Sequence, residues 1–415
     1  MSKVTSVVEP KQEQNASFFS GNVSALALSS AIKALGGFVG VYLPLYFVQI
    51  GGNPTTLGML TFTASLIQLL FLSVGGIIAD NYGRRKIIVL AALSGVVFPA
   101  LYAVVQDWRM FGLLTVFAAI GAISSPATRA TVADSIAPEK RTTGIAALQV
   151  VSTLPSVISP SVGGWLMQQY GLENGFRMGC VYAAVFAFVS MAPLLVLLKE
   201  TLQSRNAENK VSPLHDGVFD LLKPSFSGLP QSLKVLMLSY ALVAFANGAV
   251  SQYYILYASR VVGITALDWG VVVSLQLLLA GILKIPGGWL SDKFGKKKAM
   301  TVSLLLAIPM ILVFTLSQSF LQLVVSALLL VAAGIYYAPA HEALQADLTP
   351  RSMRGRISAF WDQSSAIAVG LGALAGGFAF EALGPAVPFY LFALAELGAV
   401  ILLVGMVKEP QVKET

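Results

Sequence analysis

The sequence predicts an all-α polytopic membrane protein, with twelve transmembrane helices in two pseudo-symmetric six-helix bundles. Three observations predict it: the apolar content, a repeat half a chain long, and the placement of the cations. Of the 415 residues, 56% are hydrophobic and only 11% are charged, whereas a soluble domain carries roughly 25% charged residues. The apolar residues form continuous runs of about 17 to 27, long enough to cross a ~30 Å hydrocarbon layer as helices. A membrane barrel would need alternating patterning instead.

The repeat is seen first in two segments of glycines, an acid and cations. One runs from Gly75 to Lys86 (GGIIADNYGRRK) and the other from Gly287 to Lys298 (GGWLSDKFGKKK), an offset of 287 − 75 = 212. Further along, the motif that starts at Pro126 recurs at Pro339, an offset of 339 − 126 = 213. Nearly equal offsets indicate a duplicated six-helix unit, and the two copies are parallel because six is even.

The chain then divides into tails, bundles and a linker. We expect an N-terminal tail at 1–20, a bundle at 21–198, a linker at 199–230, a bundle at 231–407 and a C-terminal tail at 408–415. The linker is polar and contains Pro213, Pro224 and Pro230. The twelve expected spans are 25–50, 55–79, 87–105, 110–133, 143–168, 177–198, 231–258, 267–290, 299–317, 320–346, 357–380 and 387–407.

The cations predict the orientation. The two tails, the linker with the start of the seventh span, and the loops after the even-numbered spans carry 21 of the 27 lysines and arginines. The opposite loops carry only Arg109, Arg177 and Arg260. Because positive loops stay in the cytoplasm, we expect a multi-pass protein of the plasma membrane with both termini cytoplasmic. The net charge of +7 therefore reflects topology, and we expect no nucleic-acid partner.

Metal and cofactor sites are not expected. The single cysteine, Cys180, lies inside an apolar run and excludes an intrachain disulfide. His341 and Glu342 would need a histidine at position 345 to form a zinc-protease helix, and that residue is Gln345. No phosphate-binding G-x-x-x-x-G-K-[ST] segment occurs, so we expect neither ATP nor an enzyme.

On these residues the chain resembles the major facilitator superfamily of secondary transporters. The resemblance covers the twelve spans, the central linker, and the G-x-x-x-D-x-x-G-R-R-K signature at Gly76–Lys86 with its weaker copy after the eighth span. It implies two bundles around a central cavity lined by spans 1, 4, 7 and 10. Spans 2, 5, 8 and 11 would form the interface between the bundles.

The signature predicts a conformational latch. Gly83 suits a tight turn, Asp80 can accept from the exposed amides at another helix's N-terminus, and Arg84 can pair with Asp134. Such a cluster would hold the cytoplasmic ends together in one conformation and release them in the other. The alternative is that the cations only fix the topology. The full set of latch residues is Gly76, Asp80, Gly83, Arg84 and Asp134, with Asp292, Lys296 and Asp347 as the second copy.

The fifth span carries Ser159-Pro160-Ser161-Val162-Gly163-Gly164, which is similar to the glycine-proline signature of drug/proton antiporters in the superfamily. Ser159 stands where those proteins have glycine, and Phe117 stands where they tend to carry an arginine in the fourth span. At these two positions the chain differs from the pattern that is typical of the drug/proton antiporters.

Ionisable groups inside the spans are costly, which makes each one a candidate functional site. Lys284 and Glu342 are expected to form an ion pair that protonation opens, or else a static pair that fixes helix packing. His341 is an alternative titrating group, and Glu396 is expected to be neutral and hydrogen-bonded inward, or to carry a proton. The coupling candidates are Lys284, Glu342, His341, Asp362 and Arg129.

The polar and aromatic residues of the spans supply candidates for the substrate cavity. Amphipathic aromatics with few fixed charges suit an apolar or amphipathic substrate, although each tyrosine could instead anchor at the membrane interface. The candidates are Tyr42, Tyr46, Gln49, Gln149, Asn247, Gln252, Tyr253, Tyr257, Gln276, Tyr336 and Tyr337.

The function predicted from these features is secondary active transport by alternating access, with proton-coupled efflux of small amphipathic or drug-like molecules. The expected partners are the small-molecule substrate, the proton and the lipid bilayer, and the protein is expected to be a monomer. The alternatives are a metabolite importer of the same fold and a ligand sensor that does not transport.

Overall fold

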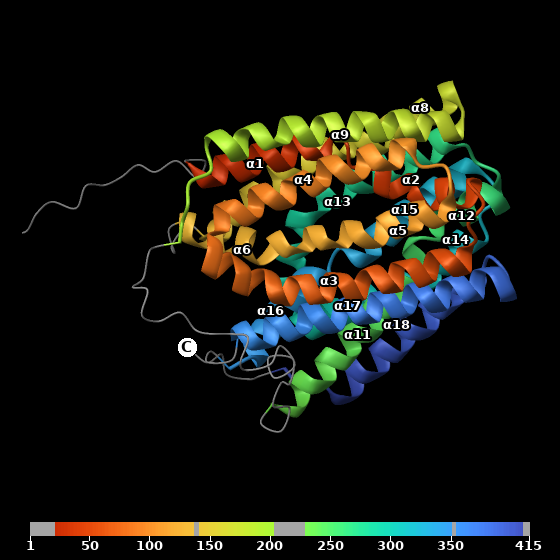
Figure 1. Cartoon of the computed structure of the whole chain (residues 1–415). Coiled ribbons are helices and arrows are strands. Elements are labelled where there is room, and N and C mark those ends of the chain that lie inside the picture. Colours follow the sequence, from red (N-terminus) through yellow and green to blue (C-terminus); the bar gives the residue numbers. More distant parts are fainter. Residues whose placement is uncertain (1–20, 137–140, 203–228, 351–353, 410–415) are drawn as a thin grey trace, which may run out of the picture.

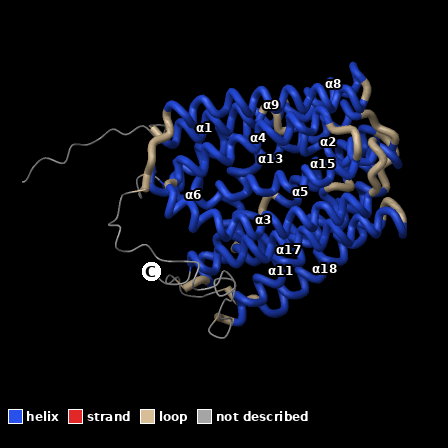
Figure 2. Tube along the Cα trace, in the orientation of Figure 1, coloured by secondary structure: helices blue, strands red, loops and turns tan. Residues whose placement is uncertain are grey.

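The architecture is all-α in a computed structural model that describes residues 21–136, 141–202, 229–350 and 354–409. The predicted N-terminal tail at 1–20, residues 410–415 of the C-terminal tail predicted at 408–415, and most of the linker lie outside the described residues. So do a few side chains within the helices, among them that of Asp292. No strand occurs in the described ranges (Figure 2). Twelve helices there are long and apolar enough to cross a membrane, as the sequence predicts.

The first six spans form the N-terminal half. Some of them consist of one helix and others of two or three consecutive segments. They are α1 (Asn22–Ala34) with α2 (Phe38–Gln49); α3 (Pro54–Tyr82); α4 (Arg84–Val104); α5 (Trp108–Ala118) with the 3₁₀ turn η1 (Ala119–Ile123) and α6 (Ser124–Ser135); α7 (Arg141–Thr153) with η3 (Leu154–Val157) and α8 (Ser159–Tyr170); and α9 (Leu172–Val196).

The C-terminal half repeats this order. Its spans are α11 (Gln231–Ser251) with α12 (Tyr254–Tyr257) and the π-helical η6 (Ala258–Val262); α13 (Ala266–Phe294); α14 (Lys296–Thr315); α15 (Phe320–Gly334) with α16 (Tyr337–Leu348); α17 (Arg354–Phe378) with the π-helical η8 (Ala379–Leu383); and α18 (Val387–Met406).

Spans 1, 4, 7 and 10 are all interrupted, and the local sequence explains two of the breaks. Pro126 lies at the third position of α6 and Pro339 at the third position of α16. Proline lacks an amide hydrogen and its ring clashes with the carbonyl four residues earlier, so a helix starts again at such a residue more readily than it continues through it. In span 4 the preceding helix passes into η1, and in span 10 the preceding helix α15 ends at Gly334. Backbone irregularity at membrane depth is tolerated where it lines a cavity or is buried in protein.

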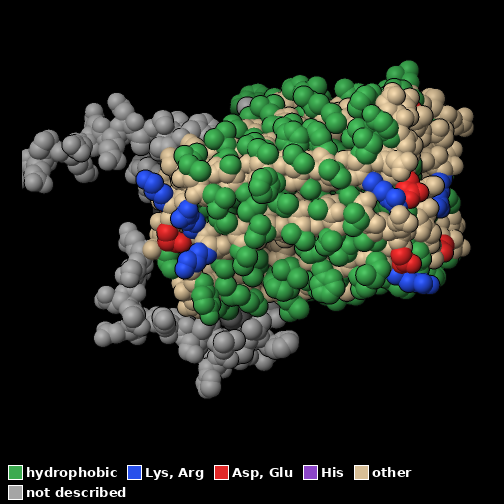
Figure 3. All heavy atoms as spheres, turned by 45° about the horizontal axis from the view of Figure 1, so that its top comes forward, with side chains coloured by type: hydrophobic (Ala, Val, Ile, Leu, Met, Phe, Trp, Pro, Cys, Tyr) green, Lys and Arg blue, Asp and Glu red, His purple; other side chains and the backbone are tan. Residues whose placement is uncertain are grey.

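The two membrane faces differ in which loops they carry. We call the face at which α1 begins and α18 ends the terminus face, and the opposite one the far face (Figure 1). The space-filling view shows a broad belt of hydrophobic side chains between the two faces, with charged side chains gathered near both ends (Figure 3). A belt of this kind suits lipid contact, because no charge has to leave water.

The hydrophobic core shows where the halves are joined. One buried cluster, which includes Tyr42, Phe111 and Phe176 together with Tyr253 and Phe389, draws on both halves. Two other clusters are separate: one contains only residues of the N-terminal half, such as Leu26 and Val132, and the other only residues of the C-terminal half, such as Leu236 and Leu403. The halves thus share a core toward the far face and have separate cores toward the terminus face.

Candidate functional site

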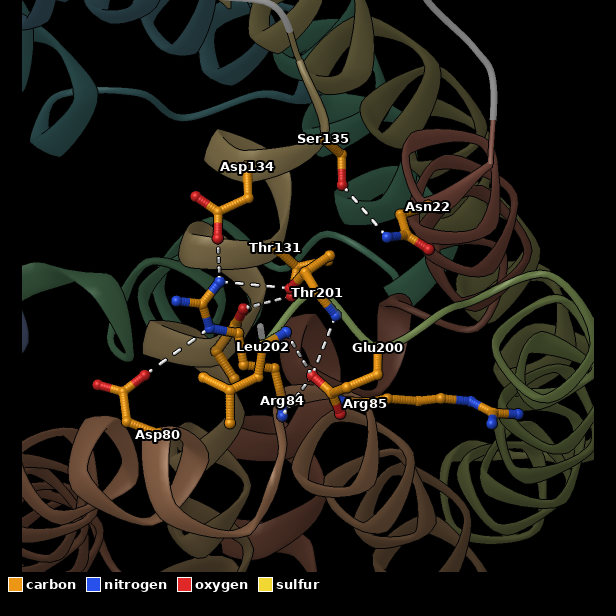
Figure 4. A network of polar contacts seen from close by, with 11 residues as sticks. Asn22, Asp80, Arg84, Arg85, Thr131, Asp134, Ser135, Glu200, Thr201 and Leu202 are labelled. Atoms are coloured by element: carbon orange, nitrogen blue, oxygen red, sulfur yellow. Dashed lines mark hydrogen bonds and ion pairs between the residues drawn. The ribbon is translucent and has the colours of Figure 1, made fainter. Parts of the chain in front are cut away.

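The first copy of the latch residues forms a polar network at the terminus face (Figure 4). The guanidinium of Arg84 forms an ion pair with Asp134 and donates to the hydroxyl of Thr201 at 3.3 Å. Its Nε lies 3.7 Å from a carboxylate oxygen of Asp80, whose side chain is 67% exposed. Among the described residues, Arg84 is the partner found for Asp80. The structure thus brings Arg84, Asp134 and Asp80 together around the end of α3.

Glu200, just after α9, is a member of this network that the sequence reasoning missed. Its carboxylate accepts from the backbone amides of Arg84, Arg85, Thr201 and Leu202, at 3.0 to 3.1 Å. An acid suits this place because the first amides of α4 have no partner inside the helix. Burial raises the pKa of Glu200, but the four amide donors outweigh burial, and the net pKa is lowered.

The C-terminal half repeats the network. Lys296 forms an ion pair with Asp347, and Glu409 accepts from the backbone amide of Lys297 at the start of α14. The side chain of Asp292, the counterpart of Asp80, lies outside the described residues. The signal that would have found both glutamates is the Lys-Glu pair after spans 6 and 12, at 199–200 and 408–409.

Gly75 and Gly83 are the glycines of the first signature segment that the backbone geometry requires. Gly75, and not Gly76, makes the close helix approach, because a Cβ on Gly75 would lie 2.3 Å from the carbonyl oxygen of Ile123, whereas one on Gly76 would have ordinary room. Gly83 has a φ of +101° between α3 and α4, a conformation that side chains rarely adopt.

The far face is closed by two related contacts, which we call the tyrosine clamps. In the first, the buried hydroxyl of Tyr42 in α2 lies 2.8 Å from the carbonyl oxygen of Pro160 in its own half and 2.9 Å from that of Ala266 in the other half. Gly164 and Gly270 line this contact, and a Cβ on either would lie within 2.7 Å of the tyrosine oxygen. The contact therefore requires glycine at both positions.

The second clamp is the counterpart of the first in the repeat. The hydroxyl of Tyr253 lies 2.8 Å from the carbonyl oxygen of Ala373 in its own half and 3.4 Å from that of Pro54 in the other half. Gly58 and Gly377 take the places of Gly270 and Gly164, with a Cβ on either coming within 3.0 Å of the tyrosine oxygen. Spans 5 and 8 meet at one clamp and spans 2 and 11 at the other.

The terminus side of the interface is hollow and polar. A cavity of about 630 Å³ is lined by the C-terminal half and by Arg129. A second cavity of about 410 Å³ is lined by the N-terminal half and by Lys284. Tyr240, Asn247, Tyr337 and Trp361 in the first cavity give it aromatic and amide walls. We call it the C-half cavity.

Charged and polar side chains cross between the halves beside these cavities. Arg129 of α6 forms an ion pair with Asp362 of α17 at 2.5 Å, and the side chains are 66% and 43% exposed. Lys284 of α13 donates to the amide oxygen of Gln149 in α7 at 2.7 Å. Lys284 therefore faces the N-terminal half. Glu342, its expected partner, lies in the C-half cavity and has no ion pair among the described residues.

The structure separates the candidates for the substrate cavity. Asn247, Tyr337 and Gln149 line the cavities, and His341 is buried in the wall of the C-half cavity. Tyr42 and Tyr253 belong to the clamps instead. Tyr46 and Tyr257 are buried in the far-side core, where large aromatic rings pack together, and Gln276 donates to Ala327 within the C-terminal half. Gln49 is exposed at the far end of α2, and Gln252 and Tyr336 are half-buried.

Two six-helix halves that share a core at one face and enclose polar cavities at the other define a membrane transporter. The chain belongs to the major facilitator superfamily, because the family model described as Major Facilitator Superfamily matches residues 23–265 and 236–415. The members of this family are transporters, so the chain is a transporter and not an enzyme.

Relatives and solved structures agree with this assignment. The chain is 24% identical over 329 residues to the multidrug resistance protein MdtG of Klebsiella pneumoniae, covering 77% of each chain. It is 22% identical over 299 residues to an MFS-type transporter of Methanocaldococcus jannaschii, covering 70% of this chain and 71% of that one. The crystal structure of a bacterial homolog of the lysosomal transporter Spinster, inward-facing and occupied, aligns with a TM-score of 0.70 at 18% identity, covering 92% of this chain and 94% of that one. This last likeness concerns the fold alone.

The polar network around Glu200 predicts a pH-dependent contribution to stability. Because the folded-state pKa of Glu200 is lowered, its stabilisation is present above the ordinary value of 4.5 and is lost as the pH falls through the lowered value. Glu200→Gln should lower the free energy of unfolding at neutral pH by no more than about 1 kcal/mol, since the site is exposed. Thermal unfolding of the detergent-solubilised protein at neutral and acid pH measures this.

Glu173→Gln is the matched control, because Glu173 is an exposed acid paired with Arg177 at the other end of α9. An equal loss of thermal stability in both variants at neutral pH would show that Glu200 has no special role. So would a loss in Glu200→Gln that persists at acid pH.

The tyrosine clamps predict that added volume opens the far face. A Cβ on Gly270 would lie 2.4 Å from the Tyr42 oxygen and 2.5 Å from that of Pro160, so Gly270→Ala should prevent closure. Tyr42→Phe removes one hydrogen bond and should shift the equilibrium by about 1 kcal/mol. Spin labels at the exposed far-face positions Gln106 and Gln318, read by pulsed electron resonance, should gain a longer-distance population.

Gly281→Ala controls for the added methyl group, since Gly281 lies in the same helix with open space around it. Distance distributions that are the same in Gly270→Ala, Gly281→Ala and the parent would rule out the clamp as the closing contact.

Proposed function

We propose that this protein is a proton-coupled secondary active transporter that exports small amphipathic or drug-like molecules by alternating access. The observation that carries the proposal is the division of the core: one shared cluster at the far face and two separate clusters at the terminus face. Such a molecule is closed on one side and hollow on the other. Rocking of the halves about their shared interface would reverse the two sides.

The walls of the C-half cavity support an amphipathic substrate. Tyr240, Tyr337 and Trp361 offer flat apolar surfaces with polar ends, and Asn247 and Glu342 add an amide and a carboxyl group. The multidrug resistance proteins among the relatives are named for drugs, which favours efflux over uptake of a metabolite.

The ion pair between Arg129 and Asp362 supports proton coupling. It joins α6 of one half to α17 of the other and is exposed to the cavity. A proton on Asp362 would neutralise the carboxylate and release Arg129, which removes an ionic link between the halves. The latch residues Arg84 and Asp134 lie within the N-terminal half in this conformation. We propose that Asp80 gains partners on the other half when the terminus face closes.

We further propose that the protein lies in the plasma membrane with both termini cytoplasmic, since its cations gather in the loops of the terminus face. The conformation described is then inward-facing. A monomer suffices for this mechanism, because both clamps and both cavities are formed within one chain.

Flux into proteoliposomes tests the function directly. A pH gradient should drive transport of at least one member of a panel of fluorescent amphipathic compounds of positive, zero and negative charge. Asp362→Asn should lower gradient-driven flux at least tenfold, equivalent to about 1.4 kcal/mol, while substrate counterflow persists. Glu173→Gln, far from the cavities, serves as the control.

The outcomes separate the alternatives. Flux lost in Glu342→Gln but kept in Asp362→Asn would assign coupling to Glu342. Absence of gradient-dependent flux for every compound would contradict the proposed function and favour a sensor.

Sided labelling tests the orientation. A cysteine at the exposed position Gln318 should react with a membrane-impermeant maleimide on intact cells, and one at Gln231 should react only after permeabilisation. The native Cys180 is fully buried and gives little background. The opposite pattern of labelling would reverse the assignment of the two faces.

A further inference from the structure

Glu396 is a charged residue type held deep inside the C-terminal half. It is the tenth of the twenty residues of α18 and is only 2% exposed. The buried residues Phe389, Phe392, Ala399 and Leu403 share its face, at the spacing of one helical stripe, so this face of α18 points into the bundle and away from lipid. Glu396 does not line either of the two cavities described above and does not belong to the proposed latch.

The carboxyl group of Glu396 lacks the partners that a structural role would require. Its Oε2 is buried and has no hydrogen-bond partner among the described residues, and no ion pair to it occurs there. A buried, unpaired carboxylate is costly in a medium of low dielectric, so such a group holds a proton or must be able to exchange one.

A second acid–base group, Tyr337, lines the C-half cavity. Tyr337 of α16 has its ring in the cavity wall, but its hydroxyl is buried and has no hydrogen-bond partner among the described residues. The charge of Glu396 acts electrostatically on this hydroxyl and on that of Tyr254. Tyr337 also packs against the buried cluster of the C-terminal half that contains Ala399, about one helical turn from Glu396, so the ring and the carboxyl group belong to the same region of the core.

His341 extends the same line of groups. Its ring stacks on that of Tyr337, with centroids 5.7 Å apart and planes 9° apart, and on that of Tyr240, at 4.3 Å and 16°. Its buried Nε2 has no hydrogen-bond partner in the described part of the chain. Three groups able to carry a proton, Glu396 on α18 and Tyr337 and His341 on α16, therefore each have a buried polar atom without a hydrogen-bond partner among the described residues. Buried polar atoms are normally paired, so this grouping requires an explanation.

We propose that Glu396 is a proton-binding site of the C-terminal half, which exchanges its proton with the C-half cavity through the hydroxyl of Tyr337. On loading, the Tyr337 hydroxyl passes its own proton to the Glu396 carboxylate and takes one from a hydronium ion in the cavity, which leaves as water. An O–H bond forms on Glu396, and the tyrosine ends neutral. The imidazole of His341, stacked on the Tyr337 ring, is a further group that can accept or donate the proton. Unloading is the reverse, and no oxidant or reductant takes part.

Several other charged groups on the helices around α18 have partners elsewhere, and Glu342 of α16 lines the C-half cavity without an ion pair among the described residues. Glu396 acts electrostatically on Tyr337 of α16 and Tyr254 of α12, and the ring of His341 stacks on the rings of Tyr337 and Tyr240. The charged side chains that have partners lie at the faces or in the cavity: Lys296 with Asp347, Lys297 with carbonyls at the end of α18, Asp362 with Arg129, and Glu381 with Thr55.

The role of this proton site in transport rests on the proposed function, whereas proton binding by Glu396 does not. The chemistry can be tested without a substrate, by infrared difference spectroscopy of the purified full-length protein during a change of pH. The wild type should show a protonated-carboxyl stretching band that is present at low pH and lost as the pH rises. The band should be absent in Glu396→Gln and retained in Glu342→Gln, whose acid faces the cavity.

Tyr337→Phe is the second variant, because it removes the hydroxyl and keeps the aromatic ring. Loss of a hydroxyl that can donate to the carboxylate should displace the titration of the band to higher pH. If Glu396→Gln does not fold, Glu396→Asp should shift the frequency of the band. A carboxyl band that does not respond to pH, or one that is unchanged in both Glu396 variants, would overturn the proposal. A titrating Glu396 in a protein without gradient-driven flux would support the site and contradict the coupling.

Discussion

The close approach of the two halves at the far face depends on backbone contact through glycine. Gly164 and Gly270 at one clamp, and Gly58 and Gly377 at the other, leave no room for a side chain. In a membrane, helices gain nothing from excluding lipid from an apolar surface, so packing and hydrogen bonds have to hold them together. The shared core, the closed far face and the hollow terminus face all follow from this contact.

Each clamp adds a tyrosine hydroxyl that lies within hydrogen-bond distance of a carbonyl oxygen of its own half and of one in the other half. The hydroxyl has one proton, so it can donate to either carbonyl at a small difference in energy. A contact of this kind can be broken and remade at low cost when the halves move. A salt bridge buried at the same place would lose several kcal/mol on opening.

Asymmetry between the halves is found in the cavity and not in the scaffold. The clamps, the terminus-face networks and the proline-started helices α6 and α16 all occur twice. The stacked rings around His341 and the buried Glu396 occur in the C-terminal half. Duplication thus supplies a frame for motion. The residues that differ between the copies are therefore the ones to which we assign the chemistry.

The sequence by itself determined the membrane class, the twelve spans, the duplication and the pairing of Arg84 with Asp134. Each of these depends on local composition or on spacing along one helix end, which the order of residues records directly. Only the tertiary structure decided that Tyr42 and Tyr253 close the far face and that Arg129 meets Asp362. It also decided that Lys284 faces Gln149 instead of Glu342, and that Glu396 faces the bundle. These outcomes depend on how each helix is rotated about its axis and on how the two halves are placed. In chains that are apolar on every side, periodicity carries little information about rotation.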